Sequence, residues 1–190
     1  DRNSSRSAAA HNGPRLVGAE PIEFWKSFRV GRRGYAGALD VASPDGAFVA
    51  AGWQSGYAHL GVDVRRAVCL WPGKGVLIAD LWRGALSKPE TGFLIPSEWD
   101  VVSGTTFRQG ELDLSVRALA GTLSPPRDAA HWYRFGVERT ACRLSVSPET
   151  MDAAARAAVF FSWSADAAVP GADVLDRLFD DLAAAIPTAG

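Results

Sequence analysis

Short runs with an apolar residue at every second position constrain the fold of this chain more than any other feature. Residues 111–119 (ELDLSVRAL) and 141–147 (ACRLSVS) both follow this pattern. Successive side chains of a β-strand point to opposite faces, so each run predicts a half-buried strand. Residues 75–82 (GVLIADLW) are almost continuously apolar, which predicts a central strand covered on both faces.

Turn sequences separate these runs at short intervals, as in SPDG at 43–46, PGKG at 72–75 and RQGE at 108–111. Glycine, proline and aspartate are the residues that tight turns require. Many short strands joined by such turns favour an antiparallel arrangement over alternating strands and helices. The sequence therefore predicts an all-β fold, an antiparallel β-sandwich with a short C-terminal α-helix.

The helix is predicted at 173–186 (DVLDRLFDDLAAAI), where the apolar residues recur at helical spacing. Asp173 can cap its start and Pro187 ends it. A second short helix is expected at 149–158, because ETMDAAARAA is rich in alanine. We divide the chain into a β-sandwich domain at 1–168 and a C-terminal helix and tail at 169–190.

The composition sets limits on the partners of the chain. Its 190 residues suffice for one domain with a real core, and its net charge of −1 favours neither nucleic acid nor an anionic membrane. No apolar run approaches the roughly 20 residues that span a bilayer. Without an initiator Met or a signal peptide, the chain is expected to be a mature form, a domain or a fragment. Cys69 and Cys142 stand in apolar runs and are expected to be free thiols.

Residues with evident chemistry are few. His11, His59 and His131 are the three histidines, and no spacing of histidines and cysteines makes a self-contained zinc site. His59 is expected on a strand. Nucleophile-elbow, P-loop and dinucleotide-binding motifs are absent from the sequence. His131 is ambiguous, although a Trp and a Tyr follow it directly.

An aromatic–arginine cluster, EFWKSFRVGRRG, occupies residues 23–34. On a continuous strand, Trp25 and Arg29 would share one face, and Phe28 and Val30 would lie on the opposite face in the core. Trp25 could then stack on a sugar while Arg29 binds a carboxylate in a bidentate fork. A structural cation–π pair between Trp25 and Arg29 is the alternative.

Five blocks of the sequence, taken in order, resemble one family. Together they resemble the C-terminal β-sandwich domain of bacterial heparinase II/III-like polysaccharide lyases over nearly all of residues 3–150. The blocks are RSAAAHN (6–12), EFWKSFRVGRR (23–33), GYAHLGVDVRRAV (56–68), VLIADLWRG (76–84) and HWYRFGVE (131–138).

The resemblance implies a lyase that cleaves uronic-acid polysaccharides by β-elimination, with an α/α-toroid domain upstream in the same polypeptide. It implies that His11 is a ligand of zinc or another divalent metal whose remaining ligands lie upstream, and it assigns no catalytic residue to this chain. Substrate contacts are predicted at Trp25, Arg29 and Tyr133. The expected partner is an acidic, uronate-containing polysaccharide, and neither nucleic acid nor a membrane is expected as a partner. By the same resemblance, the expected location is periplasmic or secreted. The alternative is a non-catalytic carbohydrate-binding or structural module.

Overall fold

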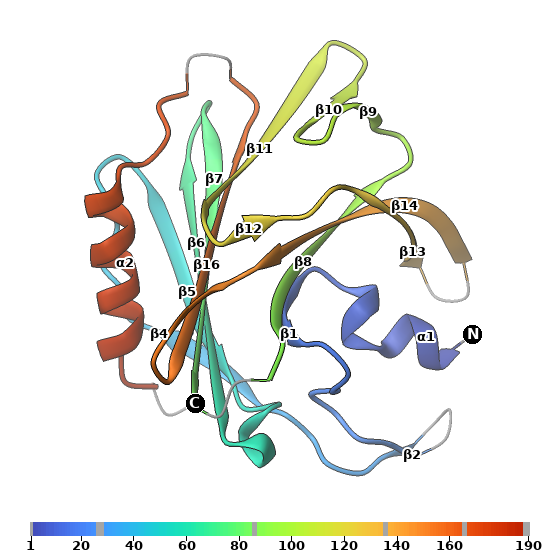
Figure 1. Cartoon of the computed structure of the whole chain (residues 1–190), viewed down its shortest axis with the longest axis vertical. Coiled ribbons are helices and arrows are strands. Elements are labelled where there is room, and N and C mark those ends of the chain that lie inside the picture. The colour runs from blue at the N-terminus through green and yellow to red at the C-terminus, as the bar shows by residue number, and fades with distance from the viewer. Residues whose placement is uncertain (1, 26–28, 85–86, 135–136, 165–166, 188–190) are drawn as a thin grey trace.

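Two antiparallel sheets and one helix are stacked in three layers (Figure 1). The computed structural model describes residues 2–25, 29–84, 87–134, 137–164 and 167–187. Within these ranges, a nine-stranded sheet packs against a five-stranded sheet on one face and against helix α2 on the other. The predicted antiparallel β-sandwich with a short C-terminal helix is confirmed.

Strands that follow one another in the sequence are neighbours in much of the larger sheet. Its order is β4 (Ala36–Leu39), β5 (Phe48–Gln54), β6 (Val62–Trp71), β7 (Gly75–Gly84), β16 (Ala154–Ser162), β11 (Leu112–Ala120), β10 (Thr106–Gln109) and β9 (Asp100–Ser103), with β15 (Glu149–Met151) paired to β16. The smaller sheet has the order β1 (Gly13–Leu16), β8 (Pro89–Pro96), β14 (Val137–Ser147) and β12 (Thr122–Leu123), with β13 (Arg127–Arg134) paired to β14. A separate hairpin joins β2 (Phe24–Trp25) to β3 (Arg29–Val30), and the short helical elements are α1 (Arg2–Arg6), η1 (Ala8–Ala10) and η2 (Ala58–Leu60).

The central strand β7 is covered on both faces, as its apolar sequence predicts. Leu77 and Ala79 pack toward α2, and Trp82 is fully buried between the two sheets. On the neighbouring strand, Cys69 is buried on the helix side, and this burial raises the pKa of its thiol to about 11. Cys142 is half-buried, and both cysteines are free, as expected.

Helix α2 (Ala172–Ala184) lies across the outer face of the nine-stranded sheet (Figure 1). Its apolar stripe, from Leu175 to Leu182, is buried against that sheet. The helix ends two residues earlier than the sequence suggests, so Ile186 lies outside it and is 83% exposed. Gly171, and not Asp173, is its N-cap. No helix in the described ranges is long and apolar enough to cross a membrane.

The prediction of a second helix at 149–158 is wrong. This segment forms β15 and the start of β16, which pairs with β7 and β11 in the middle of the larger sheet. Ala155, Ala157 and Ala158 are at most 1% exposed, because they fill the narrow space where the sheet meets its neighbouring layers. The helix propensity of alanine is worth only fractions of a kilocalorie, which tertiary packing overrides.

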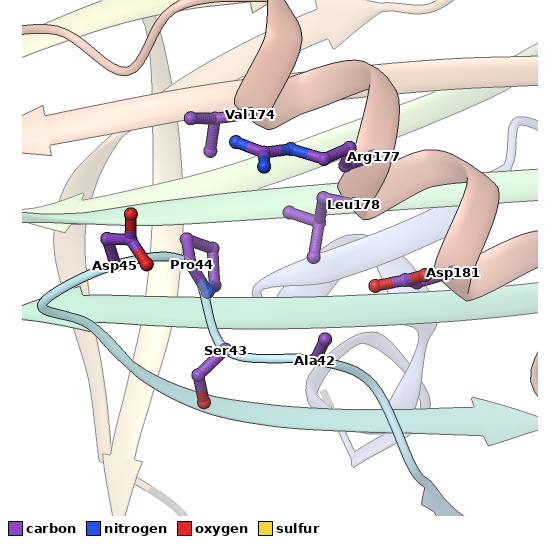
Figure 2. A pocket seen from close by; sticks show the side chains of 8 residues that line it. All are labelled: Ala42, Ser43, Pro44, Asp45, Val174, Arg177, Leu178 and Asp181. Carbon is purple, nitrogen blue, oxygen red and sulfur yellow. The ribbon is translucent and has the colours of Figure 1, made fainter.

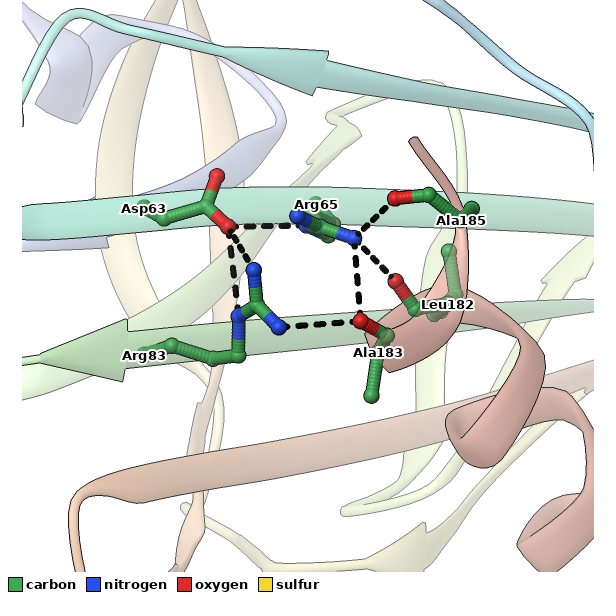
Figure 3. Close-up of polar contacts among 6 residues, drawn as sticks. All are labelled: Asp63, Arg65, Arg83, Leu182, Ala183 and Ala185. Carbon is green, nitrogen blue, oxygen red and sulfur yellow. Dashed lines mark hydrogen bonds and ion pairs between the residues drawn. The ribbon is translucent and has the colours of Figure 1, made fainter. Parts of the chain in front are cut away.

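Arg65 on β6 holds the C-terminal end of α2 (Figure 3). Its Nη1 donates to the carbonyl oxygens of Leu182 at 2.6 Å and Ala185 at 2.7 Å, and its Nε pairs with Asp63 at 2.8 Å. Arg83 on β7 binds the same Asp63 carboxylate and donates to Ala183 O at 2.9 Å. The last carbonyls of a helix have no partner within it and carry partial negative charge, so two guanidinium groups stabilise this end.

The next residue, Arg66, points to the opposite face of β6 and lies between the sheets. Its guanidinium forms a bidentate pair with Asp80 of β7, with Nε–Oδ1 at 2.6 Å and Nη2–Oδ2 at 2.7 Å. Thr91 of β8 donates its hydroxyl to the same carboxylate and accepts from Arg66 at 3.2 Å. The side chain of Asp80 is 1% exposed, so this network is a buried polar link between the two sheets.

We expect Arg66→Leu to lower the free energy of unfolding by about 3–5 kcal/mol, because it leaves the buried carboxylate of Asp80 without its counter-ion. The double variant Arg66→Leu/Asp80→Leu should recover most of that loss. Urea denaturation measures both, and Arg108→Leu, which breaks an exposed pair with Asp113, is the control at under about 1 kcal/mol. A double variant as unstable as the single one would contradict the role given to the pair.

We expect Arg65→Met to destabilise the chain by about 1.5–3 kcal/mol, the range for hydrogen bonds to a charged group. Hydrogen exchange should become faster in α2 than in β7, since the helix end loses its donors while the sheet keeps its ladder. Arg177→Met, which removes only an exposed pair with Asp173 in the same helix, is the matched control and should leave exchange unchanged. Equal acceleration in α2 and β7 would mean that the helix has no separate anchor.

Candidate functional site

His11 lies on the surface at the end of η1, and the backbone around it is held at three points. Ala8 N donates to Glu20 Oε2 at 2.8 Å, and Ala9 O accepts from Arg143 Nη1 at 2.6 Å. Asn12 Oδ1 accepts from Leu94 N at 2.7 Å. The imidazole of His11 is exposed and has no polar partner within the described residues. The segment thus presents a free imidazole on a fixed backbone.

The hydrogen bond between Leu94 N and Asn12 Oδ1 forms where the pairing of β1 with β8 ends. Strand β1 pairs with β8 as far as Gly13 opposite Gly92, and residue 11 would face Leu94 if the pairing continued. The chain turns away into η1 instead, and the side chain of Asn12 supplies the acceptor that the strand no longer provides. A backbone N–H left without a partner would cost free energy, so this bond fixes the place where His11 leaves the sheet.

A half-buried charge cluster lies beneath η1. Glu90 of β8 pairs with Arg15 at 2.7 Å and with Arg143 at 3.4 Å. Burial, and then the nearby Arg15, lower the pKa of Arg143. The guanidinium of Arg143 crosses β8 at Gly92, where any side chain would collide with it. The sequence analysis did not identify Arg143. The one local feature that could have indicated it is Gly92, a glycine inside a strand.

A series of hydrogen bonds connects the His11 segment to Trp25. Glu20 accepts from Ala8 through its carboxylate and from Arg32 Nη2 through its carbonyl at 3.4 Å. Arg32 N donates to Glu23 Oε2 at 3.1 Å, and Trp25 Nε1 donates to Glu23 Oε1 at 3.0 Å. These bonds lower the pKa of Glu23, with the indole bond as the largest cause. The carboxylate therefore loses these contacts only when pH falls below the usual range for Glu.

Trp25 and Arg29 lie on a hairpin and not on the continuous strand expected at 24–33. They are cross-strand partners in the β2–β3 pair, which places them on one face. Trp25 is 55% exposed and Arg29 is also exposed. Trp25 is held by Glu23 and packs close to Gly31, and no stacking of Arg29 on its ring is found among the described residues. The expected core position of Phe28 lies outside the described residues.

Tyr133 is on β13, in the sheet that carries η1 on its surface. Its ring is 46% exposed and meets His131 edge-on, with the centroids 6.5 Å apart. Element η1, which ends just before His11, contacts β13, the strand that carries Tyr133. The structure thus places His11 at the end of η1, Trp25 and Arg29 on the β2–β3 hairpin, and Tyr133 on β13.

The described residues contain no group of three His, Cys, Asp or Glu side chains that could hold a metal ion. His59 is in η2 and not on a strand as expected, and its Nδ1 contacts Gly56 O at 3.2 Å. His131 lies on β13. His11 is therefore not part of a complete metal site within this part of the chain.

Two hollows in the surface lie away from these residues. The smaller, of about 100 Å³, is between α2 and the loop that follows β4, and is lined by Pro44, Asp45, Arg177 and Asp181 among others (Figure 2). The larger, of about 540 Å³, lies beside the Arg65 cluster. The predicted substrate-binding residues Trp25, Arg29 and Tyr133 line neither of these two hollows.

Comparison with known proteins defines the class of this sandwich. The family described as heparinase II/III-like, C-terminal, matches residues 1–156, and the chain belongs to it. This confirms the family indicated by the sequence blocks. A search among curated proteins finds no match.

Solved structures share the fold at low sequence identity. A heparinase III with methylated lysines superposes with a TM-score of 0.62 at 14% identity, over 87% of this chain and 25% of that one. Heparan sulfate lyase HepC from Pedobacter heparinus gives 0.62 at 13% identity, over 89% and 26%. A further heparinase III gives 0.57 at 16%, over 82% and 24%. The chain spans about a quarter of the length of these proteins.

We expect Asn12→Ala to release the His11 segment from β8. The amide of Leu94 loses its acceptor, so its hydrogen exchange should accelerate about fivefold, which corresponds to the roughly 1 kcal/mol of one hydrogen bond. Asn12→Asp keeps an acceptor oxygen at the same place and is the matched control. Unchanged exchange in the alanine variant would show that the bond does not position the segment.

Proposed function

We propose that this chain is the β-sandwich part of a heparinase II/III-like lyase that cleaves uronic-acid polysaccharides by β-elimination. Membership of the family supports the class of protein. The observation that carries the proposal is the exposed imidazole of His11, which stands on a backbone fixed by Glu20, Arg143 and Leu94. A side chain that stands on a fixed backbone, with no polar partner among the described residues, is available to meet a ligand.

The reaction defines what the whole enzyme must supply. A base removes the proton at C5 beside the uronate carboxylate, the electron pair forms the C4–C5 double bond, and the glycosidic oxygen leaves from C4. Charge that develops on the carboxylate must be neutralised by a cation or by hydrogen-bond donors. In the proposal, an α/α-toroid of the same polypeptide provides the base, and this chain provides one wall of the cleft.

His11 fits the role of one metal ligand and no more. A neutral imidazole is a ligand that zinc prefers, and zinc takes four ligands in tetrahedral geometry. The described residues contain no group of three ligating side chains that would complete a site around His11. In the proposal the remaining ligands therefore come from outside this chain, and the metal supplies positive charge beside the substrate.

Exposed side chains on the β2–β3 hairpin and on β13 are suited to an acidic sugar. Trp25 and Tyr133 expose aromatic rings that can stack on pyranose faces. Arg29 is exposed and has no carboxylate partner among the described residues, so its guanidinium is available for a uronate. Such a substrate is extracellular, which supports a periplasmic or secreted location.

The same exposed rings favour a second function, that of a carbohydrate-binding module without a catalytic role. The two functions differ in what His11 does. A lyase domain needs it for metal and turnover, whereas a binding module needs only the aromatic and arginine side chains.

We expect His11→Ala, in the full-length protein that contains this domain, to lower both the bound zinc and the rate of unsaturated uronate formation at least tenfold. Metal analysis and absorbance of the unsaturated product are the measurements. His59→Ala, which removes another exposed histidine, is the matched control and should change neither. The 190-residue chain alone should show neither tight zinc binding nor turnover. Full activity of His11→Ala would favour the binding module, and turnover by the isolated chain would place the catalytic centre within it.

A further inference from the structure

A β-bulge sets the direction of Tyr133 in the β13–β14 hairpin. Trp132 pairs with Glu138 and Arg134 pairs with Val137, so Tyr133 has no partner in the ladder. An extra residue of this kind bends the strand and re-aims the side chain, and bulges are frequent beside binding sites. Here the bulge brings the ring of Tyr133 against charged side chains of the same hairpin.

Two guanidinium groups lie near this ring. The central carbon of Arg139 is 4.1 Å from the ring centroid, and that of Arg134 is 5.2 Å away. Arg139 is fixed by Glu98, whose Oε1 accepts from Nη1 at 2.8 Å. The backbone of Glu98, and then Arg139, lower the pKa of this carboxyl, so it remains ionised at neutral pH. Arg139 is therefore held in place and its charge is compensated.

Arg134 differs from Arg139 because no carboxylate pairs with it among the described residues. It is exposed beside an exposed ring, which leaves one uncompensated positive charge in the cluster. A guanidinium has five donors in a planar fork that matches a carboxylate or a sulfate. An anionic group placed here would gain both the fork and the positive field.

A second observation points to a missing partner at the same place. His131 pairs with Arg139 across the hairpin, and its ring meets Tyr133 at 71°. Its Nε2 is buried and has no hydrogen-bond partner within the described part of the chain. Buried polar atoms are normally satisfied, so an orphaned nitrogen on a ring that meets Tyr133 needs an explanation.

We infer that Tyr133, Arg134, Arg139 and His131 form a subsite for a sugar that carries an acidic group. The ring of Tyr133 takes a face of the sugar, Arg134 binds its carboxylate or sulfate, and Arg139 with Glu98 keeps the ring in place. The choice of a sugar as the ligand rests on the proposed function. The subsite itself needs neither the metal nor the catalytic centre, because all four side chains belong to one hairpin.

The test uses the 190-residue chain and four probes in NMR titrations. Glucose, glucuronate and glucose 6-sulfate share one ring and differ only at C6, and inorganic sulfate provides the anion without a sugar. We expect glucuronate, glucose 6-sulfate or both to shift the side-chain signals of Arg134 and His131, whereas glucose leaves them unchanged. The two acidic sugars distinguish a carboxylate from a sulfate site.

Three variants complete the test. Arg134→Gln should weaken binding of the acidic sugar by about fivefold to tenfold, as expected for loss of a charged hydrogen bond at an exposed place. Tyr133→Leu should reduce it to the level of inorganic sulfate. Arg117→Gln removes an exposed arginine on the other sheet and should have no effect. Unchanged β-sheet amide signals verify the fold.

Three results would overturn the inference. They are absence of shifts with both acidic sugars, equal binding of inorganic sulfate and the acidic sugars, and equal weakening by Arg134→Gln and Arg117→Gln. The His11 experiment is independent of these outcomes, since it measures metal and turnover in the full-length protein. A subsite that fails would therefore leave the lyase proposal standing, and a lyase proposal that fails would leave the titration result standing.

Discussion

Asp80 places a carboxylate between the two sheets, and the sandwich can close around it because Arg66 and Thr91 satisfy its oxygens. Two strands of the larger sheet and one of the smaller meet in this network, so it fixes how β8 lies against β6 and β7. Removing a buried charge from water is costly unless both its charge and its hydrogen bonds are matched. Strand β6, which carries Arg66, also carries Arg65 on its other face, because neighbouring residues of a strand point in opposite directions. Arg65 donates hydrogen bonds to the carbonyl oxygens at the C-terminal end of α2.

Strand β8 links this buried network to the surface segment that carries His11. Thr91 binds the buried network, Gly92 lets Arg143 pass to η1, and Leu94 binds Asn12. Contacts made by three residues of this one strand thus connect the core to the backbone beside His11. The backbone on both sides of the exposed histidine is bonded to the sheet, although η1 itself is only three residues long. Positioning of this kind is what a ligand site needs, since a metal or substrate tolerates little error in geometry.

The sequence predicts local features of this structure better than distant ones. Alternation identifies the strands at 111–119 and 141–147, and the apolar stripe identifies α2, because both patterns depend on neighbours in the chain. The alanine-rich segment at 149–158 is misleading, since its small residues are selected for the close packing of β16 and not for a helix. The aromatic–arginine segment divides into a hairpin, which its alternation does not reveal. The partners of the His11 segment are unpredictable for a further reason. Arg143 lies 134 residues from Ala9, and only the folded sheet brings them together.

The many arginines of the chain can be separated by what they contact. Arg65, Arg66, Arg83 and Arg143 are in ion pairs that hold layers or segments together, so an abundance of arginine alone says little about a ligand. Arg29 and Arg134 combine two other properties. Neither pairs with a carboxylate among the described residues, and each lies beside an exposed aromatic ring, Trp25 or Tyr133. A guanidinium next to an exposed ring presents charge and an apolar face together, as an acidic sugar requires. Both pairs are on β-hairpins, β2–β3 and β13–β14, and none of these four residues takes part in the buried network of Arg66, Asp80 and Thr91.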